Sequence, residues 1–286
     1  MDKNIQLDKI LGSAVSDGAA KLYERGDSSR IVLNKENAIE TFYFSLKNNL
    51  KYTTDEYQMK LLKTYTPAII ILEYDGCCLC SFEVNTDNNG EKHQAQIIRP
   101  KKYYMYETPD FICNFTISDT IIIYNKKTGE RIVGKREDLI QESMPRFLES
   151  KIEFEALRYR VMTKVVETEM LKGINKHNLM AKNNSISYEF YLPTIDDEDW
   201  ERTIESIGMI AFFQGMPLNI GDSVYNGYAL AGAQIFKQEG YYLDYENGLS
   251  YYHRAGCTKL KNQELRYANP EECAKEGAFP CDICKP

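Results

Sequence analysis

The chain has 286 residues, of which 43 % are hydrophobic, and this length corresponds to one large domain or two smaller ones with a sizeable core. Lys and Arg number 35 against 42 Asp and Glu, which gives a net charge of −7. A net negative chain is not expected to bind nucleic acid through its whole surface. The 17 Gly and 9 Pro are too few for a largely disordered polypeptide.

The sequence predicts neither a membrane span nor a signal peptide. The longest apolar runs, such as 68–72, are far shorter than the roughly 20 residues that cross a bilayer. The first residues lack a basic region followed by an apolar one. If Met1 is the native start, a soluble cytoplasmic protein is expected. If an N-terminal anchor helix was removed, a membrane-anchored protein outside the cytoplasm is expected, and both alternatives stay open.

Helical periodicity dominates the first part of the chain. Apolar residues at helical spacing predict helices over 4–24, 35–50 and 54–63, with Asn34 as the N-cap of the second. From residue 67 the pattern changes to short β-branched runs separated by turns. Strands are predicted over 67–74, 78–85, 93–106, 111–117, 120–125 and 130–136, a meander of five or six strands.

The second half of the chain begins with a predicted long helix over 147–182, which would cover one face of that sheet. A strand is predicted over 186–192, and the acidic run 196–199 before Trp200 predicts the start of another helix. We therefore expect an α+β fold with helices packed on a mainly antiparallel sheet. The composition changes near 240–250, which predicts a domain over 1–245 and a small module over 246–286.

One pattern with the spacing of a metal site stands near the C-terminus. His253-x3-Cys257 is followed after 23 residues by Cys281-x2-Cys284. Two close pairs of nitrogen and sulfur ligands are what a closed tetrahedral zinc site requires. A module of this size has little core, and metal binding would supply the missing stability. Disulfides, or free thiols around a core histidine, are the alternatives, and Cys273 is expected to be a small buried hydrophobe in a helix over 270–276.

The stretches Tyr252–Cys257, Arg266–Ala274 and Gly277–Pro286 resemble the Ada-type metal-binding module. That family combines a ligand-x3-Cys pair, a short helix and a Pro-Cys-x2-Cys turn. The resemblance implies one structural Zn2+ held by His253, Cys257, Cys281 and Cys284. In the methylphosphotriester-repair member of the family, a zinc-bound cysteine at the first ligand position takes the methyl group. Here that position is His253, and a zinc-bound imidazole lacks the nucleophilicity of a thiolate.

A second resemblance covers much of the rest of the chain. The segments 34–42, 175–178, 188–193 and 211–215 are similar to uncharacterised Firmicute proteins found with TadE-like components of type IV pili. Such proteins usually begin with a membrane helix, of which residues 5–24 would be the remaining part. The resemblance implies a role in surface or pilus assembly.

Weaker candidates have simpler structural explanations. Cys77, Cys78 and Cys80 form a cluster that could be a metal or redox site, but buried thiols or a disulfide to Cys113 are favoured. His93 and His177 have no visible partner and are expected to be surface or capping residues. Tyrosine clusters at 103–106, 241–245 and 251–252 suit either an interface or half-buried sheet faces, and the sheet faces are favoured.

We therefore expect a non-enzymatic structural or interaction protein of a bacterial cell-surface or pilus-type assembly. Protein partners are expected, and a homo-oligomer is possible. The rival is a nucleic-acid-associated protein that reads DNA with the Ada-like module. However, residues 253–286 hold six Lys/Arg against five Asp/Glu, which is a weak electrostatic footprint for DNA. An enzyme with an unrecognised site is the third alternative.

Overall fold

The computed structural model describes residues 3–24, 32–52, 56–86, 92–183, 188–195, 200, 205–218, 223–232, 241–246, 248–253, 257–261, 266–267 and 270–284. The chain divides into two compact units, Met1–Gln234 and Ile235–Pro286. The predicted boundary after residue 245 is therefore too late. It would cut through a strand, β12 (Tyr241–Glu246), that pairs with the following strand of the C-terminal unit.

Three helices open the N-terminal unit: α1 (Lys3–Ala20), α2 (Lys35–Asn49) and α3 (Glu56–Thr64). Asn34 is the N-cap of α2, as predicted, and its side-chain oxygen accepts a hydrogen bond from the Asn37 N–H at 2.9 Å. The first helix ends four residues earlier than the predicted 24, because the chain turns after Ala20 and enters a short ribbon of β1 (Tyr23–Glu24) and β2 (Val32–Leu33). None of the helices within the described residues has the length and apolar composition to cross a bilayer.

Apart from the ribbon of β1 and β2, the described strands of this unit form one large antiparallel sheet in the order β11-β10-β3-β4-β6-β7-β8-β9, with β5 also paired to β4. Their bounds are β3 (Ile69–Leu72), β4 (Gly76–Thr86), β5 (Lys92–Ile98), β6 (Lys102–Glu107), β7 (Phe111–Phe115), β8 (Thr120–Asn125), β9 (Arg131–Lys135), β10 (Gly208–Pro217) and β11 (Val224–Gly232). The predicted single segment 93–106 is two strands, because Pro100, which has no N–H, lies between β5 and β6. The expected α+β fold on a mainly antiparallel sheet is confirmed.

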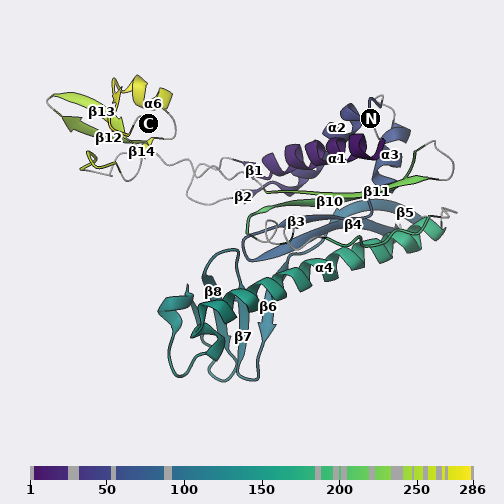
Figure 1. Ribbon diagram of the computed structural model, residues 1–286, viewed down its shortest axis with the longest axis horizontal. Helices are drawn as coiled ribbons and strands as arrows, with labels where there is room; N and C mark the ends of the chain where they lie inside the picture. Colours follow the sequence, from purple (N-terminus) through teal and green to yellow (C-terminus); the bar gives the residue numbers. More distant parts are fainter. Residues whose placement is uncertain are drawn as a thin grey trace. The chain divides into compact units, whose positions relative to one another are not determined.

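Helices cover both faces of this sheet (Figure 1). On one side α1 packs on β10 and β11, with α2 beside it. On the other side the long helix α4 (Lys151–Asn183) runs over β3, β4, β6 and β7, preceded by the 3-10 turns η1 (Arg136–Leu139) and η2 (Arg146–Leu148). The main core lies between α4 and the sheet, and it contains Trp200, the single tryptophan of the chain. All four residues of β3 are buried, as expected for a strand covered on both faces.

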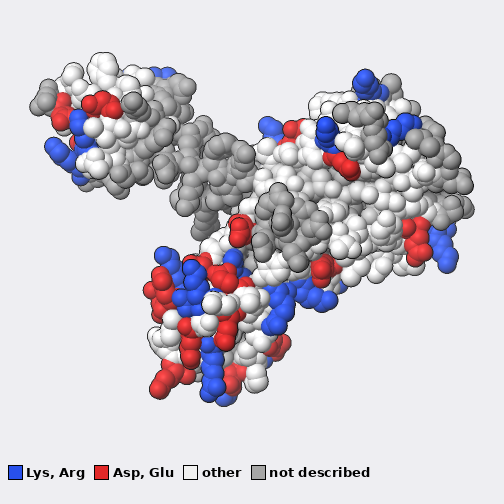
Figure 2. All heavy atoms as spheres, in the orientation of Figure 1, with Lys and Arg blue, Asp and Glu red and all other residues white. Residues whose placement is uncertain are grey.

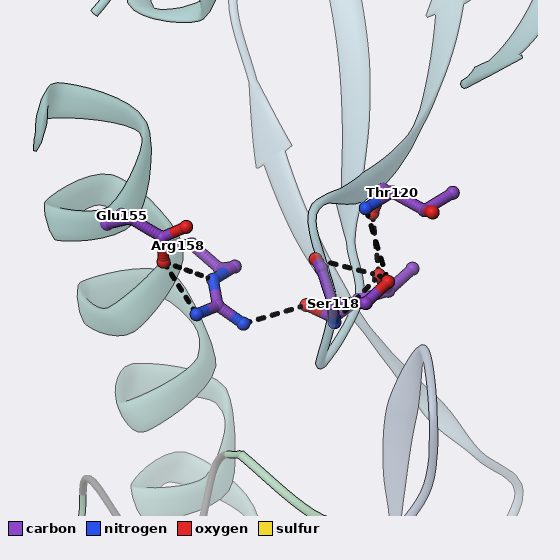
Figure 3. A network of polar contacts seen from close by, with 5 residues as sticks. Ser118, Thr120, Glu155 and Arg158 are labelled. Carbon is purple, nitrogen blue, oxygen red and sulfur yellow. Dashed lines mark hydrogen bonds and ion pairs between the residues drawn. The ribbon is translucent and has the colours of Figure 1, made fainter. Parts of the chain in front are cut away.

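Side-chain hydrogen bonds link α4 to the turn between β7 and β8 (Figure 3). The Arg158 guanidinium donates to the Glu155 carboxylate at 2.6 and 2.9 Å and to the Thr116 carbonyl at 3.4 Å. The buried Thr116 hydroxyl in turn donates to the Thr120 carbonyl at 2.6 Å. The turn is therefore held by side chains where strand pairing stops.

The predicted strand over 186–192 is wrong for its described part, because residues 188–195 form no strand. Side-chain amides pair with this backbone instead. The Asn178 amide from α4 donates to the Phe190 carbonyl and accepts from its N–H, both at 2.7 Å. Gln214 from β10 does the same to Tyr191, at 2.8 and 3.2 Å. The polar backbone is satisfied without a neighbouring strand. The predicted helix start at 196–199 lies outside the described residues.

The C-terminal unit holds β12, β13 (Leu249–His253), β14 (Arg266–Tyr267), β15 (Phe279–Pro280) and the short helix α6 (Pro270–Lys275). Its sheet has the order β14-β12-β13-β15, and β15 runs parallel to β13. The buried hydrophobic cluster among its described residues is small: Leu243, Tyr252, Cys273 and Ala278, with Tyr241 and Tyr267 packed against it.

Two glycines of α1 provide a matched test of helix packing. A Cβ at Gly18 would lie 2.9 Å from the Ala38 carbonyl oxygen and 3.1 Å from the Phe42 Cβ, both on α2, whereas a Cβ at Gly12 would meet nothing within 4 Å. Gly12→Ala should stabilise the unit by about 1 kcal/mol through helix propensity. Gly18→Ala should destabilise it by about 1 kcal/mol or more, because overpacking outweighs that gain. Urea unfolding followed by Trp200 fluorescence measures both, and equal effects would show that α1 and α2 do not pack this closely.

Candidate metal centre

Strand pairing brings the first and third predicted ligands together. β13 ends at His253, and β15 is followed directly by Cys281. The parallel register places Tyr251 beside Phe279 and Tyr252 beside Pro280. The Cys281 N–H then donates to the Tyr252 carbonyl at 3.1 Å. His253 at the end of β13 and Cys281 directly after β15 are therefore neighbours, although 28 positions separate them in the sequence.

Two turns add the remaining ligands. Cys257 starts a turn in which its carbonyl accepts from the Leu260 N–H at 3.1 Å. Its Sγ lies 3.3 Å from His253 Nδ1 and 3.9 Å from Cys281 Sγ. In the second turn, the Ile283 N–H points at Cys281 Sγ at 3.4 Å and orients that sulfur. One ligand atom from each of His253, Cys257, Cys281 and Cys284 lies within 4.8 Å of all the others. This cluster could hold one metal ion.

The surroundings of Cys257 favour the thiolate, which is the form that binds metals. Burial opposes its ionisation, but hydrogen bonds from the Lys259 N–H and from the His253, Cys284 and Cys281 side chains outweigh that effect. Together they lower the pKa of Cys257 to about 7. A deprotonated sulfur beside a buried imidazole is suited to a cation and not to an apolar core.

Residues outside the cluster support the loop that carries Cys257. Asp244 of β12 accepts a hydrogen bond from the Lys261 N–H at 2.7 Å, and this bond lowers the pKa of the Asp244 carboxyl. Lys259 forms ion pairs with Asp282 at 3.3 Å and Glu246 at 3.6 Å. The first pair joins the two turns of the cluster. Asp244 was missed from the sequence, because only the strand register places it beside that loop.

The other predicted state of these cysteines, a pair of disulfides, does not occur, since all eight cysteines are free thiols. Cys273 lies outside the cluster. As predicted, it is a fully buried residue of a short helix and belongs to the small core of the unit, and burial raises the pKa of its thiol.

The cysteines of the N-terminal unit are buried thiols, which is one of the two favoured alternatives, and the other, a disulfide to Cys113, is not formed. Cys77 and Cys113 belong to the core beneath α4. Cys78 points to the opposite face, where its thiol donates to Glu73 at 2.9 Å and accepts from Lys35 at 3.2 Å. Burial raises the pKa of Cys77, Cys80 and Cys113 to about 12 and that of Cys78 to about 11. Protonated thiols are poor nucleophiles, which argues against redox catalysis here.

His177 is not a surface residue, in contrast to one of the two predicted roles, but it does cap a helix. It is completely buried on α4, between the rings of Phe82 and Phe190 at centroid distances of 5.4 and 4.4 Å. Its Nε2 lies 2.8 Å from the carbonyl of Thr64, the last residue of α3. Its Nδ1 is buried without a hydrogen-bond partner among the described residues. His93 lies on β5, where it is paired in register with Asn85 of β4.

The tyrosine clusters follow the pleat of their strands. On β6, Tyr104 is buried, whereas Tyr103 and Met105 are about half exposed, at 48 % and 57 %. In the C-terminal unit, Tyr252 is buried against Tyr241, and Tyr245 is exposed. These are the half-buried sheet faces that the sequence favoured.

Comparison with known proteins adds no family to this description. No family model matches the chain, and neither the curated proteins nor the solved structures contain a match. The Ada-like and TadE-like resemblances therefore depend on the residues quoted above, and the structure adds only the convergence of the four ligands.

The buried His177 predicts a loss of stability in acid. Burial holds its pKa at about 4, below the ordinary 6.5, so the folded state excludes a proton that the unfolded state binds below pH 6.5. Stability should therefore fall as the pH drops from 6.5 towards 4, by about 2 kcal/mol at pH 5. Urea unfolding of the wild type and His177→Leu at pH 7 and pH 5 measures this. The variant should lose about 2 kcal/mol less than the wild type, and equal losses would contradict the neutral buried imidazole.

Proposed function

We propose that the C-terminal unit is a structural zinc module of the Ada-like type and that the chain serves as a structural or interaction protein. The observation that carries this proposal is the convergence of one nitrogen and three sulfur atoms within 4.8 Å. Three thiolates and an imidazole are a preferred ligand set of Zn2+. Cations that prefer oxygen ligands, such as Ca2+ and Mg2+, would find no carboxylate in this set.

The composition of the site favours a structural and not a catalytic metal. Catalytic zinc sites keep one coordination position open for water or substrate, whereas four protein ligands close the tetrahedron. Among its described residues, the unit around the site buries few apolar side chains, so binding of the ion would supply much of its folding free energy. Methyl transfer at the first ligand position is disfavoured, because His253 offers an imidazole in place of a thiolate.

The wider role that we propose is participation in a bacterial surface or pilus-type assembly, with other proteins as partners. Its support is the resemblance of the N-terminal part to proteins found with TadE-like components. A DNA-reading role is less favoured, because Lys259, a basic residue in the turn that carries Cys257, is already paired with the carboxylates of Asp282 and Glu246.

The zinc proposal predicts one equivalent of metal per chain. Cys281→Ser should lose it, because Cys281 supplies a central sulfur of the cluster. Cys273→Ala is the matched control, since this nearby cysteine lies outside the cluster and should retain the full equivalent. Elemental analysis of freshly purified protein measures the content, and Co2+ substitution should give the absorption spectrum of a tetrahedral thiolate site. Metal-free wild type that also fails to take up Zn2+ or Co2+ would end the proposal.

Removal of the metal should unfold the C-terminal unit selectively. A chelator should make the segment after residue 235 sensitive to protease, whereas Trp200 fluorescence, which reports on the N-terminal unit, should stay constant. Added Zn2+ should restore protection. Full protease resistance of the chelated protein would show that the unit is stable without metal. A gel shift of DNA that disappears on chelation would favour the nucleic-acid role.

A further inference from the structure

A second candidate site lies in the N-terminal unit, in a groove of about 750 Å3 along α2. The opposite wall is formed by α3, and the floor by the end of β5 and the neighbouring residue of β4. A volume of this size is typical of pockets that bind small molecules or short peptides. The side chains used below are Glu36, Ile39, Glu40, Tyr43, Phe44 and Lys47 from α2, Met59 and Lys63 from α3, and Cys80, Gln96 and Ile98 from the strands.

The middle of the groove is apolar. Ile39, Phe44, Met59 and Ile98 line it, and the Phe44 ring is 60 % exposed although it is large and hydrophobic. The floor carries polar atoms, where the buried Tyr43 hydroxyl accepts a hydrogen bond from Gln96 Nε2 at 2.7 Å. Mostly apolar walls with a few fixed polar groups are the usual composition of a binding site.

Acidic side chains line the groove near the start of α2, and basic side chains line it farther along. Glu36 and Glu40 lie one turn apart near the start of α2. Lys47 lies in the last turn of α2, and its Nζ is over the Phe44 ring at 5.2 Å. Lys63, at the end of α3, lies over the Tyr43 ring at 5.7 Å. None of these four side chains forms an ion pair with another residue in the part of the chain that the structure describes.

The charged groups define the length of an occupant. At 1.5 Å per helical residue, Glu40 and Lys47 are about 10 Å apart along α2, and Glu36 and Lys47 about 16 Å. An extended peptide advances about 3.3 Å per residue, so three to five residues span these distances. The Cys80 thiol on the floor is neutral, because burial raises its pKa to about 12, while Lys63 lowers this pKa and Glu36 raises it by smaller amounts.

We propose that this groove binds a short apolar peptide of three to five residues with free termini. The ammonium group faces Glu36 and Glu40, the carboxylate faces Lys47 and Lys63, and apolar side chains fill the middle. The two charged ends fix the direction of the bound peptide. This site is independent of the metal cluster, since all of its residues belong to the N-terminal unit.

The test is isothermal titration calorimetry of the full chain with the tetrapeptide Ala-Leu-Phe-Leu. The peptide with free termini should bind at one saturable site. Acetylation of its amino end and amidation of its carboxyl end should each weaken binding about fivefold, as expected for the loss of one partly screened ion pair.

Paired variants assign each end of the peptide. Glu36→Gln combined with Glu40→Gln should bind the free and acetylated peptides equally. Lys47→Gln combined with Lys63→Gln should bind the free and amidated peptides equally. Lys60→Gln is the matched control, because Lys60 is exposed on α3 outside the groove and should leave binding unchanged. Urea unfolding followed by Trp200 fluorescence verifies that each variant is folded.

Three results would overturn the proposal. The first is the absence of saturable binding by folded wild type. The second is equal affinity for the free peptide and for the peptide blocked at both ends. The third concerns competition by dodecanoate. If dodecanoate displaces the bound peptide at a lower concentration than a second peptide with free termini does, the groove is a site for apolar anions. None of these results bears on zinc content, so the two proposals fail separately.

Discussion

The parallel contact between β13 and β15 is the constraint on which the metal centre depends. The hydrogen bond from the Cys281 N–H to the Tyr252 carbonyl places Cys281 beside the end of β13. Each of these strands is short, and the buried cluster that supports them is small. A bound cation would therefore stabilise the same contact between β13 and β15, because it would hold His253 and Cys281 together once the strands have placed them near each other. Strand pairing and metal binding would thus depend on each other in this unit.

The N-terminal unit is stabilised in a different way. One face of its sheet is covered by α4 and the other by α1, so the central strand β3 can consist of four buried aliphatic residues. Where the chain leaves regular structure, side chains bond the backbone, as the Asn178 and Gln214 amides do at residues 190–191. This unit has a core large enough to fold without a cofactor. Its cysteines are accordingly buried thiols, whereas Cys257, Cys281 and Cys284 of the C-terminal unit converge with His253 in a cluster that could hold a metal ion.

The two candidate sites differ in the kind of chemistry that they offer. The metal cluster is compact, and an ion bound tetrahedrally by all four of its residues would have no position left for a substrate. The groove along α2 is lined by charged side chains that form no ion pair among the described residues and by the exposed ring of Phe44. In a binding protein, the metal cluster would keep the C-terminal unit folded, and the groove would select a ligand. The Cys80 thiol in the groove is not an activated nucleophile, since burial raises its pKa to about 12.

The sequence by itself determined most of the local elements and which four residues could hold a metal ion. The Asn34 cap, the helical periodicities and the spacing of His253, Cys257, Cys281 and Cys284 are all local patterns, and local patterns are set by side-chain chemistry at short range. Only the tertiary structure decided which strands pair across long separations. β10 lies beside β3 although about 140 residues separate them, and no pattern within either strand specifies this partner. The burial of His177, the amide pairing that replaces a strand at 188–195 and the groove along α2 follow from such contacts, because each requires elements that are distant in the sequence to meet.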